Sequence, residues 1–220
     1  MIRKRLILAI LLSCQIGLVA QSKLSLCYRI ETIPKIENYY QSLDSIISTC
    51  LGDDFLARVV ASPSFEPEYI MQIELVEKKY YLKVISFDNN LWYAKKVTDL
   101  TINECNYDLE TQIAERVLYL CKQFIDDRMD SVAIGFTDGD LYQFEVKVDG
   151  ALSCGQVREP ASFCPLGSMC NLCDQIKDLC FMKNKPATIL KEELQQQLFK
   201  LTTEVQNNSK TNKIENNEDN

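Results

Sequence analysis

The order of apolar periodicities along the chain constrains its fold more than any other feature. Apolar residues recur every three or four positions over 34–50, which predicts a helix with one buried face. Short runs with β character follow at 55–61, 69–76, 80–87 and 91–97. In the second of these runs, Gln72 and Glu74 alternate with apolar residues, as in a half-buried strand. The polar connections 77–79 and 88–90 suit hairpins, so we expect an antiparallel meander of three or four strands.

A second helix separates these runs from further strands. A stripe of apolar residues predicts this helix over 109–127, with Asp108 as an acidic cap at its start. Two more strands are expected at 132–136 and 141–146, because the segment between them contains the Asp-Gly pair typical of a hairpin turn.

The last third of the chain changes character along its length. Residues 151–170 have little periodicity and are interpreted as an irregular crossing, whereas 170–182 and 186–205 read as helices. Residues 206–220 are almost entirely polar, which predicts a disordered tail. Strand groups separated by helices favour an α+β fold, with an antiparallel sheet of about five to six strands packed against helices. We expect a single domain over 21–205.

The first twenty residues have the pattern of a secretory signal peptide, with basic residues at 3–5, an apolar span and Ala20 at the expected cleavage site. The apolar span is shorter than the roughly 20 residues of a membrane helix, so no transmembrane helix is expected after removal of 1–20. Lipidation of Cys14, which would leave a lipid anchor there, is an alternative. We therefore expect an exported protein that is periplasmic, on the cell surface or extracellular.

The chain is acidic, with 24 Lys and Arg residues against 31 Asp and Glu residues and a net charge of −7. Removal of 1–20 takes away three basic residues and leaves a charge of about −10. Nucleic-acid binding depends largely on basic residues that displace counterions, so a nucleic-acid partner is not expected. A protein or a glycan is the expected kind of partner.

The chain has ten cysteines and no histidine, which restricts the kinds of bonds and reactions that its side chains can provide. In an exported chain, cysteines are read first as disulfide bonds, each worth roughly 2 to 4 kcal/mol. Nine cysteines remain after removal of 1–20, so at least one of them has no cysteine left to pair with inside the chain. Cys50 and Cys121 lie on the apolar stripes of their helices. Each of them can be either a buried free thiol or part of a disulfide bond. Five disulfide candidates lie in a cysteine-rich segment over 154–180: Cys154, Cys164, Cys170, Cys173 and Cys180.

Cys170 and Cys173 form a Cys-x-x-Cys motif, which makes a thiol-disulfide oxidoreductase one alternative function. If a helix starts at this motif, its dipole would lower the pKa of the first thiol. The four cysteines from Cys164 to Cys180 lack the paired spacing of zinc knuckles, so no metal or other cofactor is expected. The absence of histidine also removes Ser-His-Asp triads and Cys-His pairs, which favours a protein that is not an enzyme.

Carboxylate chemistry does not require histidine. Two carboxyls at a defined separation would suffice for glycosidic cleavage, but the spacing selects no pair among Glu66, Glu68, Asp138, Asp140 and Glu145. Residues 138–140 also resemble part of a calcium loop, but the later glutamate is missing, which favours a hairpin turn.

Aromatic residues gather on the expected strands at Tyr80, Tyr81, Phe87, Trp92 and Tyr93. Their ordinary role is core packing, but exposed rings at Trp92 and Tyr93 would suit stacking on a sugar or contact with a partner protein. We therefore expect a non-enzymatic binding or structural domain, with a carbohydrate-binding module as a further alternative.

Three segments carry a resemblance to a known group of proteins. They are 62–68 (SPSFEPE), 91–93 (LWY) and 135–144 (GFTDGDLYQF), within a resembling region of about 55–180. The chain resembles small exported proteins of Gram-negative bacteria whose function is uncharacterised. Those proteins have a Trp-Ser-Pro segment after the second hairpin, where this chain has Cys154–Pro160. The resemblance implies export and brings no catalytic residues.

Overall fold

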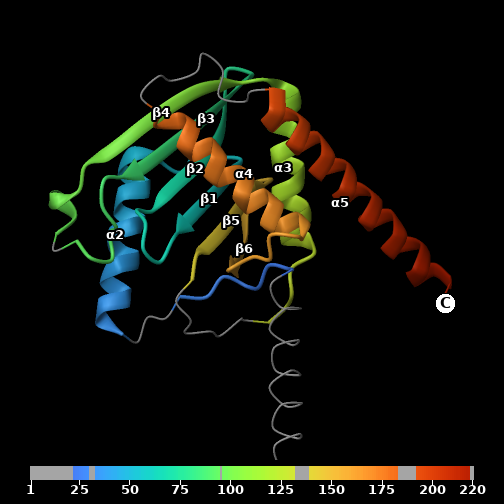
Figure 1. Ribbon diagram of the computed structural model, residues 1–220, viewed down its shortest axis with the longest axis horizontal. Helices are drawn as coiled ribbons and strands as arrows, with labels where there is room; N and C mark the ends of the chain where they lie inside the picture. Colours follow the sequence, from blue (N-terminus) through green and yellow to red (C-terminus); the bar gives the residue numbers. More distant parts are fainter. Residues whose placement is uncertain (1–21, 30–32, 95, 132–138, 183–191, 219–220) are drawn as a thin grey trace, which may run out of the picture.

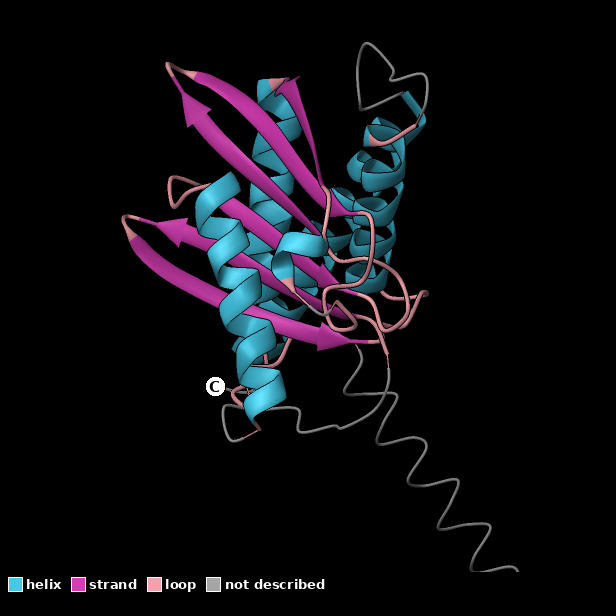
Figure 2. Ribbon diagram, turned by 90° about the vertical axis from the view of Figure 1, so that its left-hand side faces the viewer, coloured by secondary structure: helices cyan, strands magenta, loops and turns pink. Residues whose placement is uncertain are grey.

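The computed structural model describes residues 22–29, 33–94, 96–131, 139–182 and 192–218. Within these ranges, a six-stranded antiparallel sheet has helices on both faces (Figure 1), (Figure 2). The expected α+β class, with five to six antiparallel strands packed against helices, is confirmed. The expected signal peptide with Cys14, the strand expected at 132–136 and Asp138 lie outside the described residues.

The sheet combines a four-stranded meander with a hairpin. Its strands are β1 (Ala57–Ser62), β2 (Tyr69–Val76), β3 (Lys79–Phe87), β4 (Ile102–Leu109), β5 (Leu141–Val148) and β6 (Ala151–Arg158). β5 pairs with β1, so the strand order is β4-β3-β2-β1-β5-β6. The two halves of the chain therefore meet where β1 pairs with β5.

Two tight hairpins turn on residues with a left-handed backbone. Glu77 and Lys78 have φ angles of 50° and 69° between β2 and β3, and Asp149 and Gly150 have 51° and 79° between β5 and β6. Positive φ at both central residues is typical of type I′ turns, whose twist matches paired antiparallel strands. The sequence predicts the first hairpin. It misses the second, because 151–158 is strand β6 and not part of an irregular crossing.

The strand predicted at 91–97 is wrong. The Asn90 side chain accepts a hydrogen bond from the Trp92 backbone N–H at 2.9 Å, and the chain then turns into the 3₁₀ helix η1 (Val97–Asp99). A side chain that bonds backbone two residues ahead competes with strand pairing. The fourth strand of the meander is instead β4, an edge strand in which only Cys105 and Leu109 are buried.

One face of the sheet is covered by α3 (Thr111–Asp126), α4 (Pro165–Cys180) and α5 (Glu192–Glu218). The helix predicted over 109–127 is thus confirmed, but its predicted cap is wrong. Asp108 belongs to β4, and the N-cap position is Glu110, which makes no side-chain capping bond.

The C-terminal helices also differ from expectation at their ends. α4 begins at Pro165, well before the predicted start at 170, because the Cys164 sulfur accepts a hydrogen bond from the Gly167 N–H at 3.3 Å and caps an earlier turn. α5 continues to Glu218, over most of the segment whose composition predicts a disordered tail.

The face under α3, α4 and α5 carries the larger apolar core. Strand alternation brings Tyr69, Val84 and Phe144 to this face, each at most 1% exposed. The helices cover them with residues that include Leu120, Leu166 and Leu198. Six cysteines join the same core: Cys105, Cys121, Cys164, Cys170, Cys173 and Cys180.

The opposite face is only partly apolar. Helix α2 (Pro34–Cys50), at the bounds that periodicity predicts, lies across this face in front of the sheet in Figure 2. Its buried residues pack on a smaller cluster of strand and loop residues: Val60, Ile70, Ile85, Phe87 and Leu91. Within the described ranges, no helix is both long and apolar enough to cross a bilayer.

Candidate functional site

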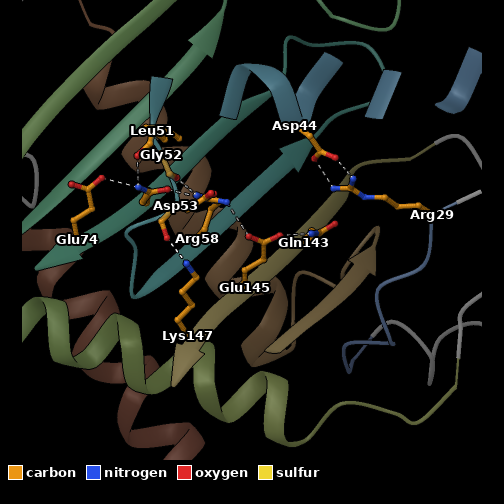
Figure 3. A network of polar contacts seen from close by, with 11 residues as sticks. Arg29, Asp44, Leu51, Gly52, Asp53, Arg58, Glu74, Gln143, Glu145 and Lys147 are labelled. Carbon is orange, nitrogen blue, oxygen red and sulfur yellow. Dashed lines mark hydrogen bonds and ion pairs between the residues drawn. The ribbon is translucent and has the colours of Figure 1, made fainter. Parts of the chain in front are cut away.

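The polar residues of β2 are buried. Gln72 is 0% exposed and Glu74 is 6% exposed, although their alternation with apolar residues predicts a half-buried strand. Strand register places Gln72 opposite Arg58, and Arg58 opposite Glu145. Arg58 Nε donates to Gln72 Oε1 at 2.9 Å, and its Nη1 lies 3.4 Å from Glu145 Oε2 (Figure 3). A buried charge requires such pairing, and we call these contacts the Arg58 network.

The Arg58 network also holds the end of α2. Arg58 Nη2 donates to the Gly52 carbonyl at 2.6 Å, and Gln72 Nε2 donates to the Leu51 carbonyl at 3.0 Å. Carbonyls at a helix C-terminus have no hydrogen-bond donor within the helix, so the Arg58 and Gln72 side chains donate to them. The network therefore sets where α2 lies on the sheet.

Towards its N-terminus, α2 forms one wall of a groove, and residues from 91–94 and 96–97 form the other. The groove, called here the α2 groove, has a volume of about 480 Å³. That size falls within the roughly 300–1,000 Å³ typical of small-ligand sites. Its lining residues are Lys35, Asn38, Tyr39, Ser42, Leu91, Trp92, Ala94, Lys96 and Val97.

Trp92 packs against α2 inside this groove. Its ring meets the Tyr39 ring edge to face, with centroids 5.6 Å apart, and Lys35 Nζ lies 4.3 Å from its centroid. Both arrangements are favourable, because ring edges are positive and ring faces attract cations. The indole is partly exposed, so a ligand in the groove would contact both the ring and the ammonium group.

Buried polar side chains position the backbone at Trp92. Glu68 is 1% exposed and accepts a hydrogen bond from the Leu91 N–H at 2.7 Å. Asn90 Nδ2 donates to the Glu66 carbonyl at 2.7 Å while its Oδ1 accepts from the Trp92 N–H. Burial raises the pKa of Glu68, and hydrogen bonds from backbone N–H groups partly oppose that rise. These bonds give the groove wall a defined shape although it lies in a loop.

The structure separates the two aromatic residues that the sequence singles out for binding. Trp92 lines the α2 groove, whereas Tyr93 is 63% exposed and is not among the lining residues. Lys35, Asn38 and Ser42, which also line the groove, are not among the site residues predicted from the sequence. Their spacing, with Tyr39, of three, four and seven positions along a predicted helix was the available signal, because such residues share one helix face.

The Cys170 and Cys173 thiols lie inside the larger core. They are 3% and 2% exposed, and burial raises the pKa of both. Because α4 begins at Pro165, neither thiol lies in the first helical turn, where the dipole acts. A reactive thiol needs access and a lowered pKa, and these two have neither.

The disulfide candidates fall on different faces of the sheet. Cys164 and Cys180 lie with Cys170 and Cys173 in the larger core, whereas Cys154 lies on β6 opposite Glu145. Among the described residues, no two cysteine sulfurs are at disulfide-bonding distance. Within the same ranges, no group of three or more Cys, Asp or Glu residues could hold a metal ion.

The carboxylates considered for glycosidic cleavage have separate partners. Glu145 pairs with Arg58, and Glu68 holds the Leu91 backbone. Asp140 Oδ1 accepts a hydrogen bond from the Ser64 N–H at 3.2 Å, and Glu66 Oε2 lies 4.0 Å from Lys177 Nζ. Each of these four carboxylates thus has a local structural role.

Comparisons of the chain with protein-family models, with curated proteins and with solved structures found no match. The resemblance to small exported proteins of Gram-negative bacteria remains a prediction from the sequence. The assignment of function therefore depends on the geometry of the α2 groove.

Proposed function

We propose that this chain is an exported, non-enzymatic binding domain whose ligand, an acidic carbohydrate, occupies the α2 groove. The composition of the groove carries the proposal, because it combines aromatic rings, an amide, hydroxyl groups and two ammonium groups in about 480 Å³. Export is supported by the signal-peptide pattern of residues 1–20.

The polar and aromatic lining suits a sugar. Sugars present apolar C–H faces, which pack on aromatic rings such as those of Trp92 and Tyr39. They also present hydroxyl groups, which both donate and accept hydrogen bonds. The Asn38 amide and the Ser42 hydroxyl can do the same, and both lie on the α2 wall.

The charge of the lining favours an acidic ligand. In the part of the groove that the structure describes, Lys35 and Lys96 belong to the lining and no carboxylate does, in a chain whose net charge is −7. Hydrogen bonds between an ammonium and a carboxylate are roughly twice as strong as those between neutral groups. A carboxylate-bearing sugar would therefore gain interactions that a neutral sugar would not.

The lining also supports a role without catalysis. Its described residues include no carboxylate, thiol or imidazole, the groups that most often act as general acid, general base or activated nucleophile. The thiols of Cys170 and Cys173 belong to the opposite side of the sheet. A binding function requires only that the groove keep its shape, which the bonds from Glu68 and Asn90 favour.

Trp92 is the sole tryptophan of the chain, so its fluorescence reports on the groove alone. We expect a saturable change in this fluorescence when the chain is titrated with an oligogalacturonate, and a much weaker response to its methyl ester, which lacks the charge. Lys35→Ala should weaken binding by roughly tenfold through loss of an ion pair. Lys122→Ala is the matched control, because Lys122 lies on α3 and pairs with Asp126.

Two results would contradict the proposal. One is a flat fluorescence signal, with no thermal stabilisation, across a panel of acidic oligosaccharides. The other is equal affinity for the acid and its methyl ester in both the wild-type and the Lys35→Ala chains, which would mean that binding does not use the groove charge.

A further inference from the structure

The N-terminal segment lies along the outer edge of β6. The Ser25 N–H donates to the Gln156 carbonyl at 2.8 Å, and the Gln156 N–H donates to the Ser25 carbonyl at 2.9 Å. Leu24, which is 1% exposed, reaches the larger core beside Gly155, where an added Cβ would lie 2.9 Å from Leu24 Cδ1. The segment therefore covers an edge that would otherwise present unpaired backbone groups.

The Ser25–Gln156 bridge brings Cys27 close to Cys154. Continuing antiparallel pairing by two residues from this bridge sets residue 27 beside residue 154. Directly opposed residues of antiparallel chains have Cα atoms roughly 4.5–5.5 Å apart, inside the range of roughly 4.4–6.8 Å that disulfides span. The Cys27 thiol donates a hydrogen bond to the Cys154 sulfur. The two thiols are therefore already in contact.

We propose that Cys27 and Cys154 form a disulfide that attaches the N-terminal segment to strand β6. Both side chains are partly exposed, unlike the thiols of Cys121, Cys170 and Cys173. The hydrogen bond from the Cys27 thiol is the main cause that lowers the pKa of Cys154 to about 7, with smaller contributions from the Cys27 backbone N–H and from Arg128; burial and Glu145 act in the opposite direction. Cys154 is thus the thiol of the pair that loses its proton first, and its thiolate is the form that reacts.

The bond forms by thiol-disulfide exchange with an external low-molecular-weight disulfide, such as glutathione disulfide. The Cys154 thiolate attacks one glutathione sulfur and displaces the other glutathione as a thiolate, which takes a proton from solvent. The Cys27 thiol releases its proton to solvent, and its sulfur then attacks Cys154 Sγ and displaces the second glutathione thiolate. The protein thiols lose two electrons, and glutathione disulfide gains them as two thiols.

The disulfide would fix the part of the chain that leads into α2. Beyond Cys27, the Tyr28 N–H donates to Gln156 Oε1 at 3.3 Å. Arg29 Nη2 donates to Asp44 Oδ1 on α2 at 2.9 Å, and its guanidinium lies 4.8 Å from the Tyr40 ring centroid. These contacts are exposed or partly exposed and contribute little separately, so a covalent bond at Cys27 would dominate attachment.

Peptide mapping tests the pair directly. The full chain is purified, reduced, exposed to glutathione disulfide at neutral pH, quenched with acid, alkylated and digested with trypsin. Cleavage after Lys23 and Arg29 isolates Cys27 in peptide 24–29, and cleavage after Lys147 and Arg158 isolates Cys154 in peptide 148–158. We expect these two peptides to appear linked before any other pair, while Cys121, Cys170 and Cys173 remain thiols until the chain is unfolded.

Matched variants separate the pair from other thiols. Cys27→Ser should leave Cys154 as a persistent mixed disulfide with glutathione, and Cys121→Ser should leave the linked peptide unchanged. Where a variant does not fold, timed alkylation of the reduced wild-type chain replaces it, and Cys154 should be labelled first. The proposal is overturned if peptides 24–29 and 148–158 stay unlinked under these conditions, or if Cys154 links to another cysteine first.

Discussion

The two faces of the sheet are built on different principles. The face under α3, α4 and α5 is a continuous apolar core that contains six of the cysteines. The face under α2 combines a smaller apolar cluster with the Arg58 network, the α2 groove and the Cys27–Cys154 pair. Side chains of neighbouring strand residues point to opposite faces, so one strand such as β5 supplies Phe144 to the first and Glu145 to the second.

This difference explains why the same residue type behaves differently on each face. On the apolar face, burial raises the pKa of Cys121 to about 12 and leaves it without reactivity at neutral pH. On the α2 face, Cys154 has a thiol neighbour and access to solvent, and its pKa is lowered. The unreactive thiols therefore lie on one face, and the groups available to ligands and oxidants lie on the other.

The largest loss in the free energy of unfolding is expected from a cavity in the apolar face. Phe144 is 0% exposed, and its ring centroid lies 6.5 Å from that of Phe124. Phe144→Ala should lower the free energy of unfolding by about 3–5 kcal/mol in urea denaturation. The control Leu152→Ala, at a position 57% exposed on β6, should cost no more than about 0.5 kcal/mol. Equal losses for the two variants would mean that this face is not the main source of stability.

Removal of one charge from the α2 face should be nearly as costly. Arg58→Met leaves the carboxylate of Glu145 without its ion-pair partner and Gln72 Oε1 without its donor, at an expected cost of about 3–5 kcal/mol. The double variant Arg58→Met, Glu145→Leu removes both charges and should recover part of that loss, as measured by urea denaturation. If the double variant is as unstable as the single one, the loss comes from packing against Phe55 and not from the unpaired charge.

Serine in place of cysteine sharpens the comparison between faces. Cys121→Ser buries a hydroxyl group in an apolar setting and should cost about 1–3 kcal/mol. Cys154→Ser should change the free energy of unfolding by no more than about 0.5 kcal/mol when the wild-type chain is fully reduced. Both values come from thermal or urea unfolding in reductant. A larger cost at Cys154 than at Cys121 would contradict the assignment of faces.

The smallest expected effect is on the pH dependence of stability, to which Glu68 in the wall of the α2 groove contributes. Burial raises the pKa of Glu68 above 4.5, so the folded chain holds this proton more tightly than the unfolded chain does. The resulting stabilisation is complete below about pH 4.5 and is lost as the pH rises through the pKa of the folded state. Glu68→Gln should therefore lose less stability than wild type between about pH 4 and pH 7 in thermal unfolding.

A second buried carboxylate provides the control for this measurement. Burial also raises the pKa of Asp174, which accepts hydrogen bonds from the Tyr69 and Tyr142 hydroxyls on the apolar face. Glu68→Gln should thus reduce the pH dependence without abolishing it, and Asp174→Asn should reduce it independently. Identical pH profiles for wild type and Glu68→Gln would show that Glu68 is not titrated differently on folding.

Local patterns predicted elements whose periodicity reflects one buried face. The helix at 34–50 and the strand at 69–76 have the bounds that their patterns predict. Prediction failed where a side chain redirected the backbone, as Asn90 does before Trp92, and where an edge strand such as β4 is mostly polar. For the site, aromatic content identified Trp92, and helical spacing was the available signal for Lys35, but nothing in the spacing of residues marked Lys96.

The sequence by itself determined the α+β class, the order of most elements and which strand residues face the same side, because these follow from short-range periodicity. Only the tertiary structure decided that Gln72 and Glu74 are buried, that Cys27 meets Cys154 and that α2 forms a groove with residues 91–94 and 96–97. Each of these depends on contacts between segments far apart in the chain. Such contacts are set by how the strands pair and how the helices pack on them, which no local pattern records.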